Sequence, residues 1–278
     1  MNRTFAAVSA AVLALVAMPA AAQDWQGGYI GVAGGYGFVA DDDNETTPFD
    51  TNLDGNFNDT VNTAPTATPP SANAFSPGFC SGSPNSNNAA AGCSDDDDPQ
   101  GELGFRAGYD WQRGSMVFGI VGEFTVSDTS DSVTAFSITP AQYSFERTLT
   151  SIKAVRGRVG MPYGRFLPYV TAGVAYGTFD NEYVTSNTVN TFSPTSEDSE
   201  NFGFQVGGGV ETHVAERVRL GVEYLYTSIE DDSDFTVRIA GGPATSPFRQ
   251  ANANGTDQRR GASDFDVHSV RLTLGFAF

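Results

Sequence analysis

The carboxyl-terminal stretch 270-VRLTLGFAF-278 alternates between two kinds of side chain. Its large apolar residues are Val270, Leu272, Leu274, Phe276 and Phe278. Because successive side chains of a β-strand point to opposite faces, the stretch is predicted to form a strand with one apolar face. A membrane barrel requires this division, since its outer face meets lipid and its inner face meets a polar lumen. A half-buried strand of a soluble β protein alternates in the same way. One strand therefore cannot distinguish the two classes of protein, and the argument depends on how often the pattern recurs along the chain.

The same alternation recurs along the chain and predicts eight strands in all. It is clearest over 101–111, where Phe105 and Tyr109 share the apolar face and Arg106 and Asp110 share the opposite one. Segments of about 9–11 residues or more suit a tilted crossing of a bilayer. The predicted strands span 25–39, 101–111, 116–126, 148–161, 167–179, 201–213, 218–228 and 270–278.

Lys153 is an exception, because it falls on the apolar face of its predicted strand. Its distance along the strand from the nearest short turn places it near the outer membrane surface, where a lysine can extend its ammonium group into water. A β-bulge that shifts the alternation beyond Ala154 is the alternative explanation.

The connections between the predicted strands alternate in length. The short ones are 112–115, 162–166 and 214–217, and the long polar ones are 40–100, 127–147, 181–200 and 229–264. Short turns at one end and long loops at the other are typical of outer-membrane barrels. In a soluble sandwich or lipocalin, no physical constraint separates short and long connections between the two ends. We therefore expect an all-β fold over residues 23–278, an eight-stranded antiparallel transmembrane up-and-down β-barrel with long extracellular loops.

The amino terminus has the pattern of a signal peptide over residues 1–22. Arg3 precedes an apolar stretch over 5–18, and the small residues of 20–22 offer a cleavage site. The stretch is short for a membrane anchor, which is the alternative. The mean hydropathy of −0.24 is compatible with a membrane barrel, because its strands are apolar at alternate residues only. We expect export to the bacterial outer membrane.

The charge of the chain is strongly acidic and unevenly placed. The net charge is −18, and no lysine or arginine occurs between Arg3 and Arg106. A chain of this charge is not expected to bind nucleic acid. The long first loop, 40–100, also carries Cys80 and Cys93, which in an exported chain predict a disulfide, with two free thiols as the alternative.

Several stretches together resemble one known family. They are 101-GELGFRAGYDWQRGSMVFGIVGEF-124, 155–160, 167-LPYVTAGVAYG-177, 207–226 and 269–278. They are similar to the Omp25/Omp31-like, opacity-type outer-membrane proteins. The resemblance implies an eight-stranded barrel inserted by the barrel-assembly machinery, which recognises a terminal aromatic residue such as Phe278. The first loop departs from the family, because it is much longer than expected.

Charged residues on the inward faces of the predicted strands are equal in number. They are Glu102, Asp110, Glu123, Glu211 and Glu223 against Arg106, Arg156, Arg158, Arg219 and Arg271. The interior of an eight-stranded barrel is just wide enough for side chains to fill, and an unpaired charge there costs several kcal/mol. The equal numbers predict an ion-pair network that blocks the lumen. A narrow water-filled path is the alternative.

Other candidate sites are weaker. Aromatic residues near strand ends could form interfacial girdles or simply favour strands; they are Trp25, Tyr109, Trp111, Tyr169, Tyr224, Tyr226, Phe276 and Phe278. Asp50, Asn52 and Asp54 match the start of an EF-hand calcium loop, but Val61 occupies the twelfth position, so we predict no metal site beyond this weak calcium candidate. His213 and His268 are expected at opposite ends of the barrel, too far apart to cooperate in catalysis.

These observations predict a non-enzymatic protein without a cofactor. We expect a structural or surface-interaction role in the cell envelope, in contact with outer-membrane lipids and lipopolysaccharide. The acidic loops could gather divalent cations. A small-solute, cation-leaning porin is one alternative function, and a surface receptor for a haem-type ligand is another.

Overall fold

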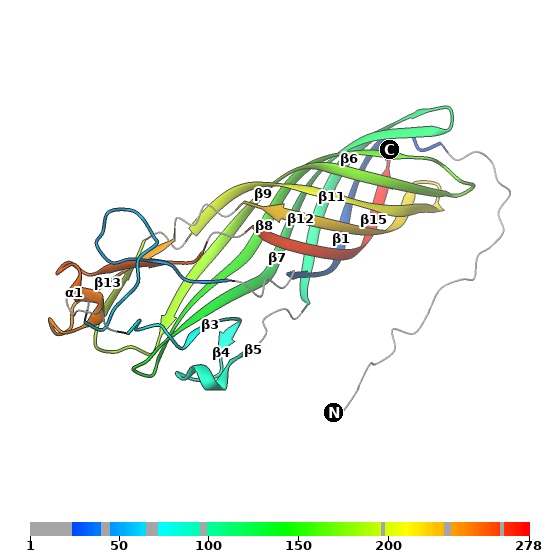
Figure 1. The fold of residues 1–278 in the computed structure, drawn as a ribbon. Coiled ribbons are helices and arrows are strands. Elements are labelled where there is room, and N and C mark those ends of the chain that lie inside the picture. Colours follow the sequence, from blue (N-terminus) through cyan, green and yellow to red (C-terminus); the bar gives the residue numbers. More distant parts are fainter. Residues whose placement is uncertain are drawn as a thin grey trace, which may run out of the picture.

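The structure is a computed structural model, and Figure 1 shows a barrel that continues at one end into a folded extension. The predicted signal peptide lies outside the described residues, as do the acidic runs 41–43 and 95–98. We refer to the folded extension, built from the four long connections, as the crown. The described residues are 24–39, 45–64, 72–94, 99–195, 198–230, 235–261 and 264–278.

Eight antiparallel strands form the barrel, each paired with the strands that neighbour it around the ring. Pairing of β7 with β8, and of β1 with both β6 and β15, closes the ring. The predicted barrel is therefore confirmed. The strands are β1 (Gly27–Val39), β6 (Gln100–Arg113), β7 (Met116–Ser137), β8 (Ala141–Gly160), β9 (Phe166–Thr185), β11 (Asp198–Ala215), β12 (Val218–Ile229) and β15 (Phe265–Ala277).

The two faces of each strand meet different surroundings, as the alternation predicts. Phe105, Ile120 and Leu272 lie on the outer wall with exposed fractions of 64%, 46% and 61%. Their sequence neighbours Arg106 and Arg271 are buried on the inner face. Large apolar side chains on the outer face are suited to contact with lipid. Water-soluble proteins rarely expose such side chains in continuous rows, because contact with water is unfavourable for them.

Lys153 lies on the outer wall, so its side chain follows the predicted parity. Its Nζ atom is 5.4 Å from the centre of the Tyr176 ring, within the range of a cation–π contact. A bulge does occur on β8, but it lies between Leu149 and Ser151, farther from the short turns than Lys153. The bulge therefore does not explain the position of this lysine.

The prediction of a polar loop over 127–147 is wrong. β7 and β8 continue beyond the barrel as one hairpin whose turn begins at Ile138, and Figure 1 shows these green strands entering the crown. The pairing register between β7 and β8 shifts between Val126 and Thr129. This bulge interrupts the alternation of apolar and polar side chains at the point where the lipid-facing part of the strand ends. Farther along, Ser132 and Thr134 alternate with Val133 and Ala135, and all four are buried, so this part of the strand does not face lipid.

In its described residues, the crown contains short strands and two short helices. A four-stranded sheet has the order β10-β13-β14-β2, β3 adds to β7, and β4 pairs with β5. Cys80 and Cys93 form the predicted disulfide, with 6.0 Å between their Cα atoms. Among the described residues, no helix has the length and apolar character needed to cross a membrane. The elements are β2 (Phe49–Asp50), β3 (Gly78–Ser81), β4 (Ser83–Pro84), η1 (Ala89–Ala91), β5 (Cys93–Ser94), β10 (Thr191–Pro194), β13 (Thr236–Ala240), α1 (Pro247–Gln250) and β14 (Thr256–Arg259).

The crown has an apolar core of its own. Residues from the first loop, the β7–β8 hairpin and the last loop pack together, and Phe75 lies among the rings of Phe49, Tyr143 and Phe248. The crown is thus a packed unit rather than a set of separate loops. The buried residues of this core are Phe49, Val61, Ala74, Phe75, Val133, Ala135, Ala141, Tyr143, Phe145, Phe235, Val237, Ile239 and Phe248.

Phe75→Ala should destabilise the crown by about 3–5 kcal/mol, because it removes a buried ring that three other rings contact. Amide hydrogen exchange measured by mass spectrometry should accelerate in the crown and stay slow in the barrel strands. Phe79→Ala on β3 is the matched control, since Phe79 is 39% exposed and outside this core. Equal exchange in the two variants would contradict the packed crown.

Candidate functional site

The lumen near the short turns contains a cluster of four charged side chains, which we name the lower cluster. Arg158 contacts Asp110 at 2.5 Å and Glu211 at 2.8 Å, and Arg219 contacts Asp110 at 2.6 Å. All four side chains are buried. Two arginines and two carboxylates leave this cluster without net charge.

A second cluster, the upper cluster, lies farther along the lumen and centres on Glu223. Its carboxylate lies 3.4 Å from Arg106, 3.6 Å from Arg156 and 2.7 Å from Arg271. Each of these arginines comes from a different strand, so a single carboxylate links β6, β8, β12 and β15 across the barrel. Such shared pairing is what a buried arginine needs to offset its loss of water.

Two further carboxylates complete the upper cluster. Glu123 lies 3.1 Å from Arg156 and 2.6 Å from Arg271, and Glu102 lies 3.7 Å from Arg271. Three arginines and three carboxylates again balance. The structure therefore places all ten predicted lumen residues inside the barrel, and it divides them into two neutral clusters.

Two tyrosines that the sequence analysis did not assign to the lumen lie among these charges, and Tyr169 connects the two clusters. The Tyr169 hydroxyl donates a hydrogen bond of 2.8 Å to Glu223, while the Arg158 guanidinium lies over the rings of Tyr169 and Tyr29 at 5.1 and 4.9 Å. The prediction that Tyr169 and Trp25 belong to the interfacial girdles is wrong, because both are buried in the lumen. The parity of β9 is the signal that identifies Tyr169, since Val170 faces outward.

Little space is left between these side chains. A Cβ atom at Gly119 would collide with the carboxylate of Asp110, so glycine makes room there for the pair of Asp110 and Arg158. A cavity lined by Tyr29, Arg106 and other lumen residues has a volume of about 10 Å³. A cavity must have about 10–15 Å³ to hold one water molecule. The described lumen around this cavity is filled by protein.

Apolar side chains cover the charged clusters at both ends. At the short-turn end, Trp25 is fully buried with Val117 and Leu167, and its ring centre lies 4.3 Å from that of His213. At the crown end, buried apolar residues from five barrel strands form a second layer. Those residues are Val39, Leu149, Ile152, Ala154, Ala175, Phe179, Ile229, Phe265 and Val267.

The two histidines lie on different faces of the wall. His213 is buried inside, whereas His268 lies on the outer face, with its Nδ1 atom 2.6 Å from the Tyr224 hydroxyl. Phe38 and Tyr226 also contact the ring of His268. The two histidines therefore do not face each other, and His268 belongs to an aromatic group on the outer wall.

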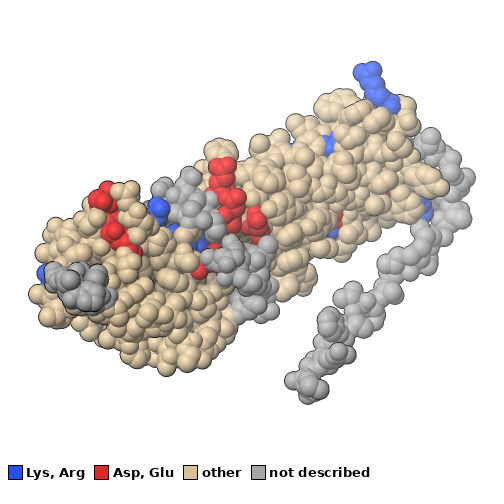
Figure 2. Space-filling view, viewed as in Figure 1, with Lys and Arg blue, Asp and Glu red and all other residues tan. Residues whose placement is uncertain are grey.

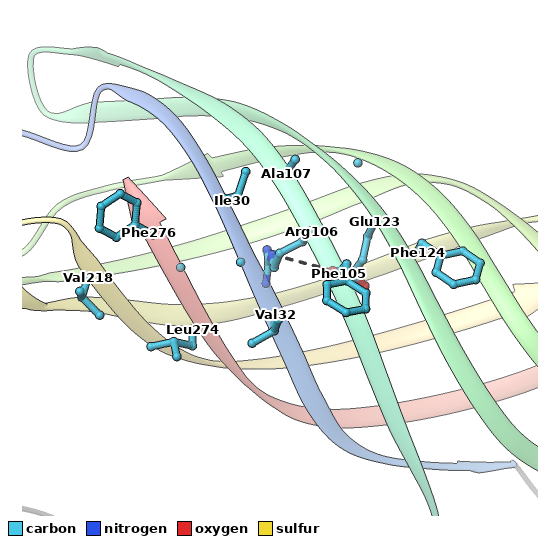
Figure 3. Close-up of a pocket in the computed structure, with 13 residues that line it drawn as sticks. Ile30, Val32, Phe105, Arg106, Ala107, Glu123, Phe124, Val218, Leu274 and Phe276 are labelled. Carbon is cyan, nitrogen blue, oxygen red and sulfur yellow. Dashed lines mark ion pairs between the residues drawn. The ribbon is translucent and has the colours of Figure 1, made fainter. Parts of the chain in front are cut away.

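A hollow of about 840 Å³ lies on the outer wall, on the lipid side of the barrel. Figure 3 shows Phe105 and Ala107 on β6 among the lining residues, and a dashed line marks the ion pair of Arg106 and Glu123. The small side chains of Ala107 and Gly122, paired across β6 and β7, cause the depression. Because it opens toward the bilayer, this hollow is not an entrance to the lumen.

A third group of charges joins the crown to the barrel. Arg260 pairs with Glu45 and lies 2.6 Å from Asp131, and Arg147 lies 3.0 Å from Asp131 and 3.7 Å from Glu45. Burial alone would lower the pKa of Arg260, but the attraction of Asp131 and Glu45 outweighs it and raises the pKa. We name these four residues the junction cluster. The sequence analysis placed Arg147 and Arg260 in loops and did not predict their pairing.

The calcium candidate adopts the geometry of a turn. The Asp50 carboxylate accepts backbone hydrogen bonds from Leu53, Asp54 and Gly55 at 2.6, 3.2 and 2.8 Å. Both of its oxygens therefore bind amide groups of its own loop. Within the described ranges, no cluster of three or more His, Cys, Asp or Glu side chains is arranged to hold a metal.

Comparison with known proteins identifies the family. The family model of the outer membrane protein beta-barrel domain matches residues 7–278. The chain belongs to this family. The resemblance to outer-membrane proteins predicted from the strand motifs is therefore confirmed, and with it the location in the bacterial outer membrane.

The comparisons also find individual outer-membrane proteins that are similar to this chain. The chain is 34% identical over 172 residues to a 22 kDa outer membrane protein of Rhizobium leguminosarum bv. viciae, covering 62% of this chain and 63% of that relative. The solved structure of OprG from Pseudomonas aeruginosa matches with a TM-score of 0.48 and 16% identity, over 91% of this chain and 97% of OprG. The protease OmpT of Escherichia coli matches with a TM-score of 0.41 and 9% identity, over 91% of this chain and 97% of OmpT.

Glu223→Gln should lower the unfolding free energy of the barrel by about 3–5 kcal/mol, because three buried arginines lose a shared counter-charge. Urea unfolding in lipid vesicles, followed by tryptophan fluorescence, measures this change. Glu216→Gln in the exposed β11–β12 turn is the matched control and should leave the midpoint unchanged. Identical midpoints for both variants would show that the upper cluster does not stabilise the barrel.

Asp131→Asn should loosen the base of the crown, since both arginines of the junction cluster lose a charged acceptor. We expect the free energy of local opening to fall by about 1.5–3 kcal/mol, the usual contribution of a hydrogen bond to a charged group. Hydrogen exchange of the amides in 256–261 reports this opening. The control is Asp128→Asn, which changes an exposed residue on the same strand. If hydrogen exchange of the amides in 256–261 accelerated equally in both variants, the junction cluster would not stabilise the base of the crown.

Proposed function

We propose that this protein is a closed, non-catalytic outer-membrane barrel that anchors a folded crown at the cell surface. Its role is then structural and surface-interactive, and the barrel does not serve as a route for solutes. The crown supplies the contact surface, while the lumen supplies the stability that holds it in place.

The observation that carries this proposal is the filling of the lumen by two neutral clusters between two apolar layers. A cation-selective pore would favour an excess of carboxylates along a hydrated path. The lumen instead pairs every one of the five named arginines with a carboxylate. Moving an ion through would require breaking these pairs in a region that holds little water.

The charge of the crown supports a role at the surface. Figure 2 shows acidic side chains on the crown and at its base, and Asp54, Glu182 and Glu200 are among the exposed acids there. Such a surface attracts divalent cations, which could bridge it to the phosphate groups of lipopolysaccharide. Outer-membrane lipids would cover the wall, where Phe105 and Leu272 are exposed.

The carboxyl end supports insertion by the barrel-assembly machinery. The Phe278 amide donates a hydrogen bond of 2.9 Å to Gly28, which ties the last residue to β1. Its side chain remains 72% exposed and is accessible to a partner during assembly.

The purified protein should be silent in planar lipid bilayers, because its lumen lacks a continuous hydrated path. Folding is checked first by heat-modifiable migration on gels, and an open general porin inserted into the same membrane serves as the positive control. Steady conductance steps that grow with salt concentration would overturn the closed-barrel proposal. A cation-dependent reversal potential in those steps would instead support the cation-leaning porin.

A further inference from the structure

The outer end of the crown contains a pocket of about 460 Å³ that the closed-barrel function does not use. Its lining comes from three segments that are distant in sequence, together with Ala74 and Phe75. The first segment contributes residues 137, 139–141 and 143, the second contributes 186–190, and the third contributes 243 and 245–248. Small-molecule sites in proteins commonly have volumes of about 300–1,000 Å³, so this pocket has the size of a binding site.

The floor of the pocket is aromatic. The rings of Phe75, Tyr143 and Phe248 lie 5.1 to 5.9 Å from one another at angles of 60° to 63°. Edge-to-face packing of this kind holds all three rings in fixed positions. Each ring is at most 4% exposed, so the three rings form a rigid buried base beneath the pocket.

The walls of the pocket are amides and hydroxyls that hold one another in place. The side-chain amide of Asn187 donates 2.9 Å to the Tyr143 hydroxyl, and that of Asn190 donates 3.0 Å to Ser246 and 3.1 Å to the carbonyl of Gly241. Gly241 adopts a φ of 66°, in the left-handed region that favours glycine. This turn brings the 243–248 segment back against Asn190.

The pocket is uncharged although the chain carries a net charge of −18. The described residues that line it are all neutral, and the hydroxyl residues Thr139, Thr188 and Thr245 are exposed at its rim. The adjacent Arg249 is not part of the lining, and its guanidinium is held away from the pocket by hydrogen bonds to the carbonyls of Gly242 and Ala253. A charged ligand would lose water here without gaining a counter-charge.

We propose that this pocket binds a neutral sugar ring of a surface polysaccharide. A pyranose ring has an apolar C–H face and a belt of hydroxyl groups at its edge. The first fits the exposed apolar side chains of Pro140, Val189 and Pro243, which the aromatic base supports, and the second fits the rim of threonine hydroxyls. This inference rests on the proposed surface role and names the class of ligand that the crown would take.

The same sugar chemistry could come from two sources. One is the polysaccharide of lipopolysaccharide in the protein's own membrane, and the other is a glycan on another cell. The pocket lies at the end of the crown remote from the barrel, where its lining includes the β7–β8 turn. Either source can reach it.

The test is equilibrium binding of the purified, folded full-length protein to defined polysaccharides. The probes are neutral hexose oligosaccharides, the same oligosaccharides carrying sialic acid or sulfate, and the polysaccharide released from lipopolysaccharide of the source cells. We expect neutral probes to bind about tenfold more tightly than their acidic counterparts. Binding of the released polysaccharide alone assigns the ligand to the same membrane, and binding of the neutral oligosaccharides alone assigns it to another cell.

Two neighbouring substitutions locate the binding. Thr245→Arg places a long cation at the pocket rim and should weaken binding about tenfold or more. Ala244→Arg adds the same charge at the adjacent exposed residue, which does not line the pocket, and should leave binding within about twofold. Both variants should keep the hydrogen-exchange pattern of the crown.

Three outcomes would overturn the proposal. They are no binding by any probe, equal binding of neutral and acidic probes, and equal losses in the two arginine variants. These results are independent of the conductance measurement. A barrel that does not conduct and binds no sugar would support the closed-barrel function and contradict the sugar site. A barrel that conducts and binds sugar would contradict the closed-barrel function and support the sugar site.

Discussion

The pairing of buried charges across a lumen too narrow for bulk water is the constraint on which this structure depends. An arginine on the inner face of an eight-stranded barrel cannot keep its hydration, so it must find a carboxylate on another strand. Glu223 meets this need for three arginines at once. Glycines such as Gly119 are required for the same reason, because the paired side chains occupy the space that a Cβ would take.

The outer wall and the crown follow from how the strands continue beyond this filled centre. Within the membrane, outward positions carry large apolar side chains because lipid is the solvent. Past the bulges on β7 and β8, the same strands exchange lipid contact for contact with other loops, and residues such as Phe136 and Phe145 become buried. The junction cluster lies between the lipid-facing part of the strands and the part that packs within the crown. It links the last long loop to the β7–β8 hairpin and gives the crown a fixed base.

The closed lumen that we propose would place the function of the molecule at its outer end. The crown offers two surfaces of different chemistry, an acidic exterior suited to cations and an uncharged pocket with an aromatic floor. They differ because the pocket is lined by neutral amide, hydroxyl and apolar groups, among which Asn187 and Asn190 are held in place by hydrogen bonds within the crown. The barrel contributes rigidity to both, since the hairpin of β7 and β8 runs continuously from the membrane into the crown.

The sequence by itself determined the barrel, the alternation of short turns with long connections, and the ten charges that face the lumen. These properties depend on an alternation that is local, because a side chain's face follows from its position along its own strand. Only the tertiary structure decided which charges pair. Arg106 and Glu223 are 117 residues apart, and their contact depends on the tilt and register of the strands around the closed ring. The crown and its pocket were equally hidden from the sequence, since segments such as 137–143 and 243–248 carry no period that indicates their partners.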